Sequence, residues 1–246
     1  MADIFGEALR DFWEDRYTQD IMTHSTLGGE DSIPLPYLFR NFDQMPEVER
    51  RALELARGKV LDIGCGAGGH ALHLQEKGME VTGLDSSPGC ISICRERGLQ
   101  STVQCPIMEY RDQGYDTLLL PMNGIGLAGT LENLGAFLAH LASLLRPGGQ
   151  ILMDSSDIIY MFDQDSDGGY WIPGDTHYYG EVTFTMAYKN FRSEPFPWIY
   201  VDYNTLHYAA VENGLACELI YEGDHYEFLA RLGPLAHGFP QENVGP

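Results

Sequence analysis

The chain has 246 residues, of which 36 are acidic and 15 are basic, giving a formal net charge of -21, and 44% are hydrophobic. This length suits one α/β domain with additions and supplies enough residues for a full core. The acidic excess disfavours nucleic-acid substrates, whose phosphates are neutralised by lysine and arginine.

The N-terminal part, residues 1–57, is expected to form a helical cap and lid. Apolar residues recur at helical spacing between residues 3 and 18, which predicts an amphipathic helix. Residues 23–36 are rich in glycine, serine, threonine and proline and are expected to form a loop or lid. A second helix of good helix formers is expected at 47–57, and Gly58 ends it.

Residues 58–233 are predicted to form the core, in which apolar strands alternate with helices that cover the sheet. This order is typical of a doubly wound parallel sheet. The elements expected in its first part are, in chain order, a strand at 60–63, a helix at 70–77, a strand at 81–84, a helix at 89–97, strands at 102–104 and 116–120, a helix at 131–145 and a strand at 150–154.

After the fifth strand this alternation breaks, and an inserted β element is expected at about 155–200. Residues 182–188 alternate between apolar and polar side chains, which predicts a strand within it. Residues 234–246 carry proline and glycine and are expected to form a loosely held tail. The last core elements are expected as a helix at 204–212 and strands at 217–221 and 226–232.

The main functional signal lies in Val60–Gly69, VLDIGCGAGG, where an apolar strand enters a glycine turn that opens a helix. A second apolar strand, Val81–Leu84, ends in Asp85, which can accept both hydroxyls of a ribose. Together these segments make one βαβ nucleoside-binding unit. A Cβ on the turn glycines would stand where a ligand approaches the backbone; these glycines are Gly64, Gly66 and Gly68.

Two kinds of cofactor fit such a unit. The spacing of the glycines also matches the dinucleotide fingerprint, so an NAD(P)-dependent oxidoreductase is one alternative. Asp62, at the end of the first strand, would face a pyrophosphate unfavourably but suits a cofactor with an ammonium and a sulfonium. This favours S-adenosylmethionine, bound either by an enzyme or by a non-catalytic S-adenosylmethionine-binding protein.

With the Pro147-Gly148-Gly149 turn before another buried strand, the unit resembles the class I S-adenosylmethionine-dependent methyltransferases, whose first motif is an acidic residue followed by Gly-x-Gly-x-Gly. The resemblance covers roughly residues 58–153. It implies a Rossmann-like α/β fold, doubly wound, with a mostly parallel seven-stranded sheet, an antiparallel last strand, an N-terminal helical cap and a small β insertion. It also implies methyl transfer to a small-molecule acceptor, with a protein side chain as the second choice.

The family often presents an acid to the adenine after the third strand. In this chain Pro106 occupies that place, so the adenine contact is expected from the backbone of Ile107 and Met108, or from Glu109. Ser86 either lines the ribose or caps the next helix.

Other contacts are expected at the methionine end. In the family the segment before the core folds over the cofactor, so Arg40 either clamps its carboxylate or pairs with Asp43 at the surface. His70 is expected to touch the methionine end, and Asn123 either orients the cofactor or acceptor or serves only its turn. The full set of expected cofactor contacts is Arg40, Asp62, Gly64, Cys65, Gly66, Gly68, His70, Asp85, Ser86, Ile107, Met108 and Asn123.

No catalytic residue or general base is assigned, because a sulfonium already activates its methyl group and the protein chiefly has to align the nucleophile. Aromatic ring faces stabilise cations, although aromatics in an inserted sheet are more often core. The acceptor-side candidates are Tyr37, Asp154, Tyr160, Trp171, Tyr178, Tyr188 and Trp198.

The sequence also indicates a cytoplasmic protein without membrane contact. No apolar run approaches the ~20 residues that span a bilayer, and the N-terminus lacks a basic region followed by an apolar core. The five cysteines form no repeating pattern, which fits a reducing compartment. Cys90 and Cys94 share a helical face, but no second pair follows at zinc-finger spacing, so no metal site is expected.

Overall fold

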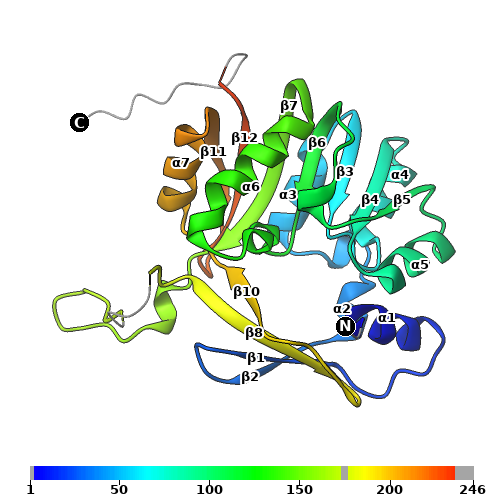
Figure 1. The fold of residues 1–246 in the computed structure, drawn as a ribbon, viewed down its shortest axis with the longest axis horizontal. Coiled ribbons are helices and arrows are strands. Elements are labelled where there is room, and N and C mark those ends of the chain that lie inside the picture. The colour runs from blue at the N-terminus through cyan, green and yellow to red at the C-terminus, as the bar shows by residue number, and fades with distance from the viewer. Residues whose placement is uncertain (1–2, 173–176, 236–246) are drawn as a thin grey trace.

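The computed structural model describes residues 3–172 and 177–235, so the expected tail lies outside it from residue 236 onward. Two sheets lie one below the other (Figure 1). The larger has seven strands, in the spatial order β11 (Leu215–Glu222), β12 (Glu227–Pro234), β7 (Leu145–Ser156), β6 (Tyr115–Leu120), β3 (Lys59–Ile63), β4 (Glu80–Asp85) and β5 (Ser101–Gln104).

β12 runs antiparallel to both of its neighbours, and the remaining adjacent pairs of this sheet are parallel. The predicted fold class is therefore confirmed, including the antiparallel last strand. The β3–β4, β4–β5 and β6–β7 crossovers each carry an α-helix, whereas a 3₁₀ turn alone lies between β5 and β6. The helices that cover this sheet are α3 (Glu47–Leu55), α4 (Gly69–Glu76), α5 (Pro88–Glu96), α6 (Leu131–Leu144) and α7 (Tyr203–Glu212).

Successive residues of the central strands face two different hydrophobic layers. Leu61 and Leu118 belong to the layer packed under α6 and α7. Val60 and Leu119 belong to the layer packed under α3, α4 and α5. Because both faces of these strands are covered, their sequences are continuous apolar runs, and this made them easy to recognise.

The smaller sheet is antiparallel and lies below the larger one in Figure 1. The expected loop over 23–36 is wrong in part, because this segment contributes to a β-hairpin that pairs with the predicted 182–188 strand. A strand so distant in sequence supplies the hydrogen bonds, so local composition could not reveal the pairing. The strands are β10 (Phe196–Ile199), β8 (Glu181–Tyr188), β1 (Ile21–Ser25), β2 (Glu30–Ile33) and β9 (Phe191–Arg192), which pairs with β8.

Short helices complete the described chain. Among the described residues no helix is long and apolar enough to cross a membrane, and no group of three or more His, Cys, Asp or Glu side chains could hold a metal ion. The short helices are α2 (Leu35–Leu38) and the 3₁₀ turns η1 (Phe42–Gln44), η2 (Ile107–Glu109), η3 (Gly124–Ala128) and η4 (Ile159–Met161).

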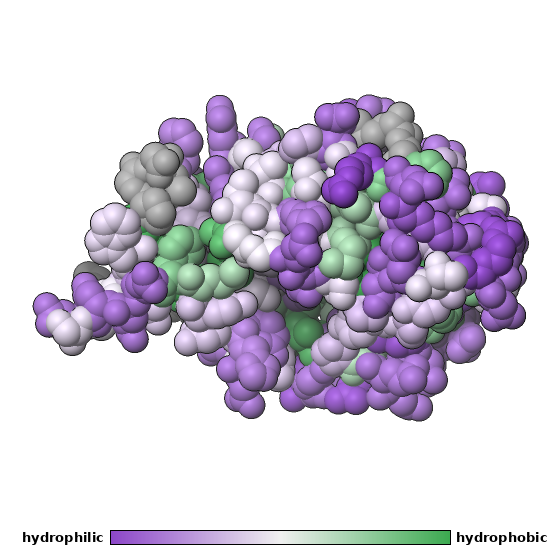
Figure 2. Space-filling model, turned by 90° about the horizontal axis from the view of Figure 1, so that it is seen from below, coloured by the Kyte–Doolittle hydropathy of each residue, from purple (hydrophilic) through white to green (hydrophobic). Residues whose placement is uncertain are grey.

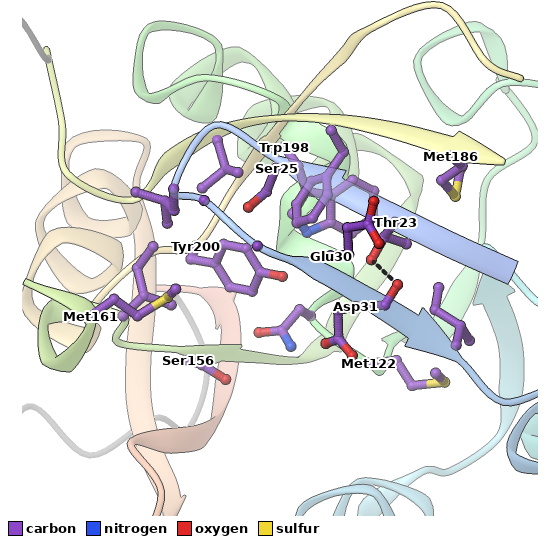
Figure 3. A pocket seen from close by; sticks show the side chains of 18 of the residues that line it. Thr23, Ser25, Glu30, Asp31, Met122, Ser156, Met161, Met186, Trp198 and Tyr200 are labelled. Carbon is purple, nitrogen blue, oxygen red and sulfur yellow. Dashed lines mark hydrogen bonds between the residues drawn. The ribbon is translucent and has the colours of Figure 1, made fainter.

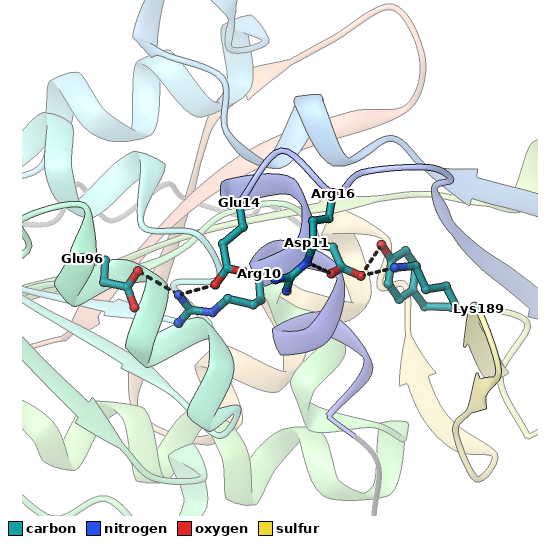
Figure 4. A network of polar contacts seen from close by, with 7 residues as sticks. Arg10, Asp11, Glu14, Arg16, Glu96 and Lys189 are labelled. Atoms are coloured by element: carbon teal, nitrogen blue, oxygen red, sulfur yellow. Dashed lines mark hydrogen bonds and ion pairs between the residues drawn. The ribbon is translucent and has the colours of Figure 1, made fainter.

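The N-terminal helix α1 (Ile4–Trp13) joins the two sheets. On one side it packs on α5: Asp3 accepts the Gly6 amide at 3.0 Å, as its N-cap, and also the Gly89 amide of α5 at 2.9 Å. Arg10 of α1 donates to Glu96 of α5 at 2.7 Å (Figure 4). α1 is therefore fixed to the core of the larger sheet.

On its other side α1 holds the end of β8 through Asp11. This carboxylate accepts the Tyr188 hydroxyl at 3.1 Å and the Arg16 Nε at 3.1 Å, and it pairs with Lys189 (Figure 4). Although burial opposes the change, the hydrogen bonds from Lys189, Arg16 and Tyr188 lower the pKa of Asp11. One acidic residue thus connects α1 with the smaller sheet.

We expect Asp11→Ala to lower the free energy of unfolding by about 1–3 kcal/mol, because the buried Tyr188 hydroxyl and the Lys189 ammonium lose their acceptor. Urea unfolding would measure this change. The matched control is Glu14→Ala on the same helix, whose partly exposed pairs with Arg10 and Arg16 predict a change below about 0.5 kcal/mol. Equal effects of the two substitutions would contradict the connecting role of Asp11.

Candidate active site

The glycine turn lies at the carboxyl end of β3, where it opens α4. Gly64 and Gly66 have φ angles of +73° and +53°, a region that L side chains rarely adopt. A Cβ on Gly64 would have only Leu127 near it, at 3.9 Å, and a Cβ on Gly66 only the Gly64 carbonyl oxygen, also at 3.9 Å. Both glycines therefore border open space, as expected for a ligand cradle.

Gly68 needs a correction. Its φ is +82°, but a Cβ there would lie 3.0 Å from the Cys94 sulfur of α5, so it meets protein and not a ligand space. The Cys65 thiol is likewise turned inward, since it is buried with its sulfur 3.7 Å from that of Cys94. Cys65 still borders a pocket. Close packing of α5 explains the third glycine.

Asp85, at the end of β4, faces the turn. It accepts the Gly66 amide at 3.0 Å and the Ser87 amide at 2.8 Å, one on each carboxylate oxygen. Burial raises the pKa of Asp85, while these two amides oppose the rise. Each oxygen keeps a lone pair for a further donor, as a ribose contact requires. Ser86 is exposed and the α5 cap is Ser87, so the capping alternative for Ser86 is wrong.

A buried acid, Asp62, lies near the end of β3, just before the glycine turn. Asp62 is fully buried, and neither of its carboxylate oxygens has a hydrogen-bond partner among the described residues. Burial raises its pKa to about 6, against the opposing influence of His70 and of the Ala71 amide. An unpartnered carboxylate in such a place is costly unless a cation is bound beside it.

Glu49, on α3, organises the residues that the sequence placed at the methionine end. The Glu49 Oε2 lies 2.6 Å from the His70 Nε2, and both carboxylate oxygens of Glu49 pair with the Arg40 guanidinium. The Arg40 guanidinium is centred 3.7 Å above the Tyr37 ring. Its Nε is buried and has no hydrogen-bond partner among the residues that the structure describes. The sequence predicted that Arg40 either clamps the cofactor carboxylate or pairs with Asp43 at the surface, and neither prediction included Glu49. The surface pair is wrong because Arg40 is buried.

The sequence did carry a signal for Glu49. The buried stripe of α3 comprises Val48, Glu49, Ala52 and Leu53, so one acid interrupts an otherwise apolar face. Although burial opposes the change, His70 and then Arg40 lower the pKa of Glu49. A buried carboxylate held by a guanidinium and an imidazole is a costly arrangement unless all three groups are fixed.

A pocket of about 180 Å³ lies between these groups. It is bordered by the glycine turn, by Arg40 and His70, and by residues that follow β6 and those of β10. Its lining is Phe5, Leu38, Arg40, Met45, Ile63, Gly64, Cys65, Gly66, Ala67, Gly69, His70, Pro121, Met122, Gly124, Leu127 and Trp198.

The adenine side is less closely defined. Ile107 begins η2 after β5 and is buried, and its carbonyl is hydrogen-bonded to the His140 Nε2 at 2.8 Å. Met108 follows it and is exposed. Both residues lie at the expected edge of the sheet, and their contact with a ligand stays a prediction.

The turn after β6 is strained. Met122 and Asn123 have φ angles of +61° and +57°, which non-glycine residues adopt only at a cost. Asp154 of β7 holds the turn by accepting a hydrogen bond from the Asn123 backbone amide at 3.0 Å. The Asn123 Oδ1 is buried and has no hydrogen-bond partner within the described part of the chain. Burial raises the pKa of Asp154 to about 7. Asp154 supports the turn and is not among the residues that line a pocket, which corrects its acceptor-side role.

A second cavity, of about 690 Å³, lies between this turn and the smaller sheet (Figure 3). Alternate residues of each strand face it, since strand side chains point in turn to opposite sides. Seen from below, apolar side chains lie in a hollow of an otherwise hydrophilic face (Figure 2). The strand residues at alternate positions that line it are Thr23, Ser25, Asp31, Ile33, Val182, Phe184, Met186, Phe196 and Trp198.

The acceptor-side aromatics divide into three groups. Trp198 and Tyr160 line the larger cavity. Tyr178 instead donates its hydroxyl to Asp202 at 2.7 Å, and Tyr188 is fully buried against α1, so both are corrected to structural roles. Trp171 is 73% exposed and Tyr37 stacks on Arg40, and neither lines the cavity.

Comparisons with known proteins agree with this geometry. A family model described as a methyltransferase domain matches residues 60–149. The crystal structure of an S-adenosylmethionine-dependent methyltransferase from Bacteroides fragilis, in complex with S-adenosyl-L-homocysteine, is 43% identical over 94% of each chain, with a TM-score of 0.87. The chain belongs to the class I S-adenosylmethionine-dependent methyltransferases.

Other relatives of this methyltransferase are more distant. A ubiquinone biosynthesis O-methyltransferase from Xanthomonas oryzae pv. oryzae is 34% identical over 110 residues, which are 42% of this chain and 45% of that protein. The chain thus matches less than half of that relative's length. DesVI of Streptomyces venezuelae, at 21% identity, shares the fold over 81% of this chain and 95% of its own, with a TM-score of 0.56.

The residues of this methyltransferase fit the cofactor of the family. The space beside Gly64 and Gly66 would be filled by a Cβ, Asp62 lacks a partner for its carboxylate, and Arg40 has an unpaired Nε beside the smaller pocket. An α-amino acid with a sulfonium offers a cation to the Asp62 carboxylate and a carboxylate to the Arg40 guanidinium.

We expect Gly66→Ala to weaken the binding of S-adenosyl-L-homocysteine at least tenfold while the protein stays folded, because the new methyl group enters open space at the cradle. Titration calorimetry would measure the affinity. Gly98→Ala is the matched control: Gly98 has a φ of +97° and open space around it at the end of α5, so the backbone cost is similar. A comparable loss of binding in both variants would rule out the cradle.

Stability should depend on pH through Asp154. A carboxyl whose pKa rises on folding from 3.8 to about 7 holds its proton more tightly in the folded chain, so its contribution to stability falls as the pH rises between these values. Relative to the unsubstituted protein, Asp154→Asn should therefore gain stability between pH 5 and pH 8, on the order of 1–3 kcal/mol. Urea unfolding without cofactor measures it.

Asp167→Asn, on an exposed loop, is the control for that measurement and should show no such gain. If Asp154→Asn showed the same difference from the unsubstituted protein at both pH values, burial of a protonated Asp154 would be excluded.

Proposed function

We propose that this methyltransferase transfers a methyl group from S-adenosylmethionine to a small molecule held in the larger cavity. The observation that carries the proposal is that the two spaces are adjacent. The pocket of about 180 Å³ and the cavity of about 690 Å³ share four lining residues, which are Phe5, Leu38, Met122 and Trp198. A donor in one is therefore adjacent to an acceptor in the other.

The cofactor assignments follow from the site. Asp85 would accept the ribose hydroxyls, held in place by the Gly66 and Ser87 amides. The Asp62 carboxylate would face the methionine ammonium, and the Arg40 Nε its carboxylate. In this arrangement the positive sulfur adds to the cations that stabilise the buried acids.

When bound, the cofactor supplies an electrophilic methyl group. The protein contributes alignment and exclusion of water. Met122 and Trp198 form the junction of the two spaces, and the strained turn directs the Asn123 Oδ1 toward a hydrogen-bond donor of the acceptor. Asp154 acts as a positioning residue through the Asn123 amide.

The acceptor is proposed to be a small molecule because strands from two separate parts of the chain, β1–β2 and β8–β10, form the smaller sheet that covers the cavity. Such a cover leaves less access for a folded protein substrate than an open edge would. The net charge of -21 disfavours nucleic acid. The name of the Xanthomonas oryzae relative, a ubiquinone biosynthesis O-methyltransferase, supports this class of acceptor.

The test is transfer of labelled methyl from S-adenosylmethionine into a cell extract that is then separated by size. We expect label in the small-molecule fraction, and at least a tenfold slower transfer with Asp85→Asn, because the ribose loses its charged acceptor. Titrations with S-adenosyl-L-homocysteine and NAD accompany it.

The other outcomes separate the alternatives. Binding of NAD alone would favour an oxidoreductase. Binding of S-adenosyl-L-homocysteine without transfer would indicate a non-catalytic binding protein, and label confined to protein would replace the small-molecule acceptor by a side chain.

A further inference from the structure

The charge of the larger cavity is one-sided. Its lining includes Glu30 and Asp31, whereas no lysine, arginine or histidine lines it among the residues that the structure describes. Apart from the Asn123 amide, the other lining side chains are apolar, aromatic or hydroxylic. An anionic acceptor would therefore lose its hydration without gaining a cationic partner, which is unfavourable.

Both acids are exposed and border the cavity, but Asp31 is the one that shares a strand face with other lining residues. It lies opposite Thr23 in the β1–β2 register and, by strand alternation, on the same face as Thr23 and Ile33, which also line the cavity. The Ser32 amide donates to the Asp31 Oδ1 at 2.7 Å and fixes the carboxylate. Alternation places Glu30 on the opposite face with His24, whose Nδ1 is 3.6 Å from the Glu30 Oε1.

Aromatic groups surround the same space. Trp198 and Tyr200 line it from the β10 side and Phe184 from β8 (Figure 3). Burial, and then the nearby Tyr160 and Asp31, raise the pKa of Tyr200, so its hydroxyl stays neutral. Ring faces next to a carboxylate favour an organic cation over a neutral ligand, because both the ring quadrupoles and the carboxylate attract positive charge.

We propose that the methyl acceptor is an organic cation, an amine on an apolar or aromatic body, with Asp31 as the counter-ion of its ammonium and the rings of Trp198 and Tyr200 as its walls. The ammonium stays protonated and anchors the molecule, while a separate nucleophilic atom of the same molecule forms the bond to the methyl group as the S–CH3 bond of S-adenosylmethionine breaks and S-adenosyl-L-homocysteine leaves. This inference rests on the proposed function, because it names the acceptor class of the same cavity. The charge of -21 on the chain also favours the approach of cations.

The test uses three probes with one ring system: tryptamine, tryptophol and indole-3-acetate, which are cationic, neutral and anionic at pH 7. Their binding to the full chain saturated with S-adenosyl-L-homocysteine is measured by titration calorimetry. Tryptamine is expected to bind at least tenfold more tightly than tryptophol, and indole-3-acetate more weakly than either. Asp31→Asn should reduce tryptamine affinity at least fivefold and leave that of tryptophol unchanged.

Glu194→Gln is the control: it removes one charge from an exposed residue just before β10 that is not among those lining the cavity, and tryptamine affinity should stay within twofold. Failure of S-adenosyl-L-homocysteine to bind would contradict the proposed function itself. If it binds, and tryptamine binds no better than tryptophol or not at all, only the acceptor class is overturned. Equal losses in Asp31→Asn and Glu194→Gln would likewise overturn it, since a general charge effect would then suffice.

Discussion

The attachment of α1 to both sheets is the constraint on which the cavity depends. Asp3 fixes the start of α1 to α5, and Asp11 fixes its end to the last residues of β8. The two helices approach so closely that a Cβ on Gly89 would lie 2.3 Å from the Gly6 Cα. Together with the packing of β10 on η3, this contact fixes the distance of the smaller sheet from the carboxyl edge of the larger one, and so the volume between them.

The second constraint is electrostatic. Asp62, Asp154 and Glu49 are buried close to one another, and burial raises the pKa of the first two to about 6 and about 7. Arg40 and His70 balance only Glu49 directly. The site therefore holds more buried negative charge than it can pair, which is unfavourable in the free protein and favourable once a cation is bound. The same sign continues into the larger cavity at Asp31.

The sequence predicted the cradle better than the acceptor side. The structure brings Gly66 and Asp85 together, because neighbouring strands of a parallel sheet bring their carboxyl ends to one edge, so a local motif already implies a spatial cluster. Their contact with a ligand stays a prediction. Tyr178 and Tyr188 were misassigned because a tyrosine in an inserted element has the same local pattern whether it faces a cavity or a partner such as Asp202 or Asp11. Glu49 interrupts an apolar helix face, yet nothing in its segment indicates that Arg40 and His70 would meet it.

The strands of the larger sheet, its strand-turn-helix unit and the position of the expected nucleoside cradle could be predicted from the residues alone, because each depends on hydrophobic periodicity and turn chemistry within a few tens of residues. The smaller sheet, in which Thr23 is paired with Met186, became evident only in the folded chain, and so did the identity of the residues that line the larger cavity. The physical reason is that a β-strand is completed by hydrogen bonds to another strand. When that partner lies far away in the chain, the segment's own residues do not specify which strand it joins or which side it turns inward.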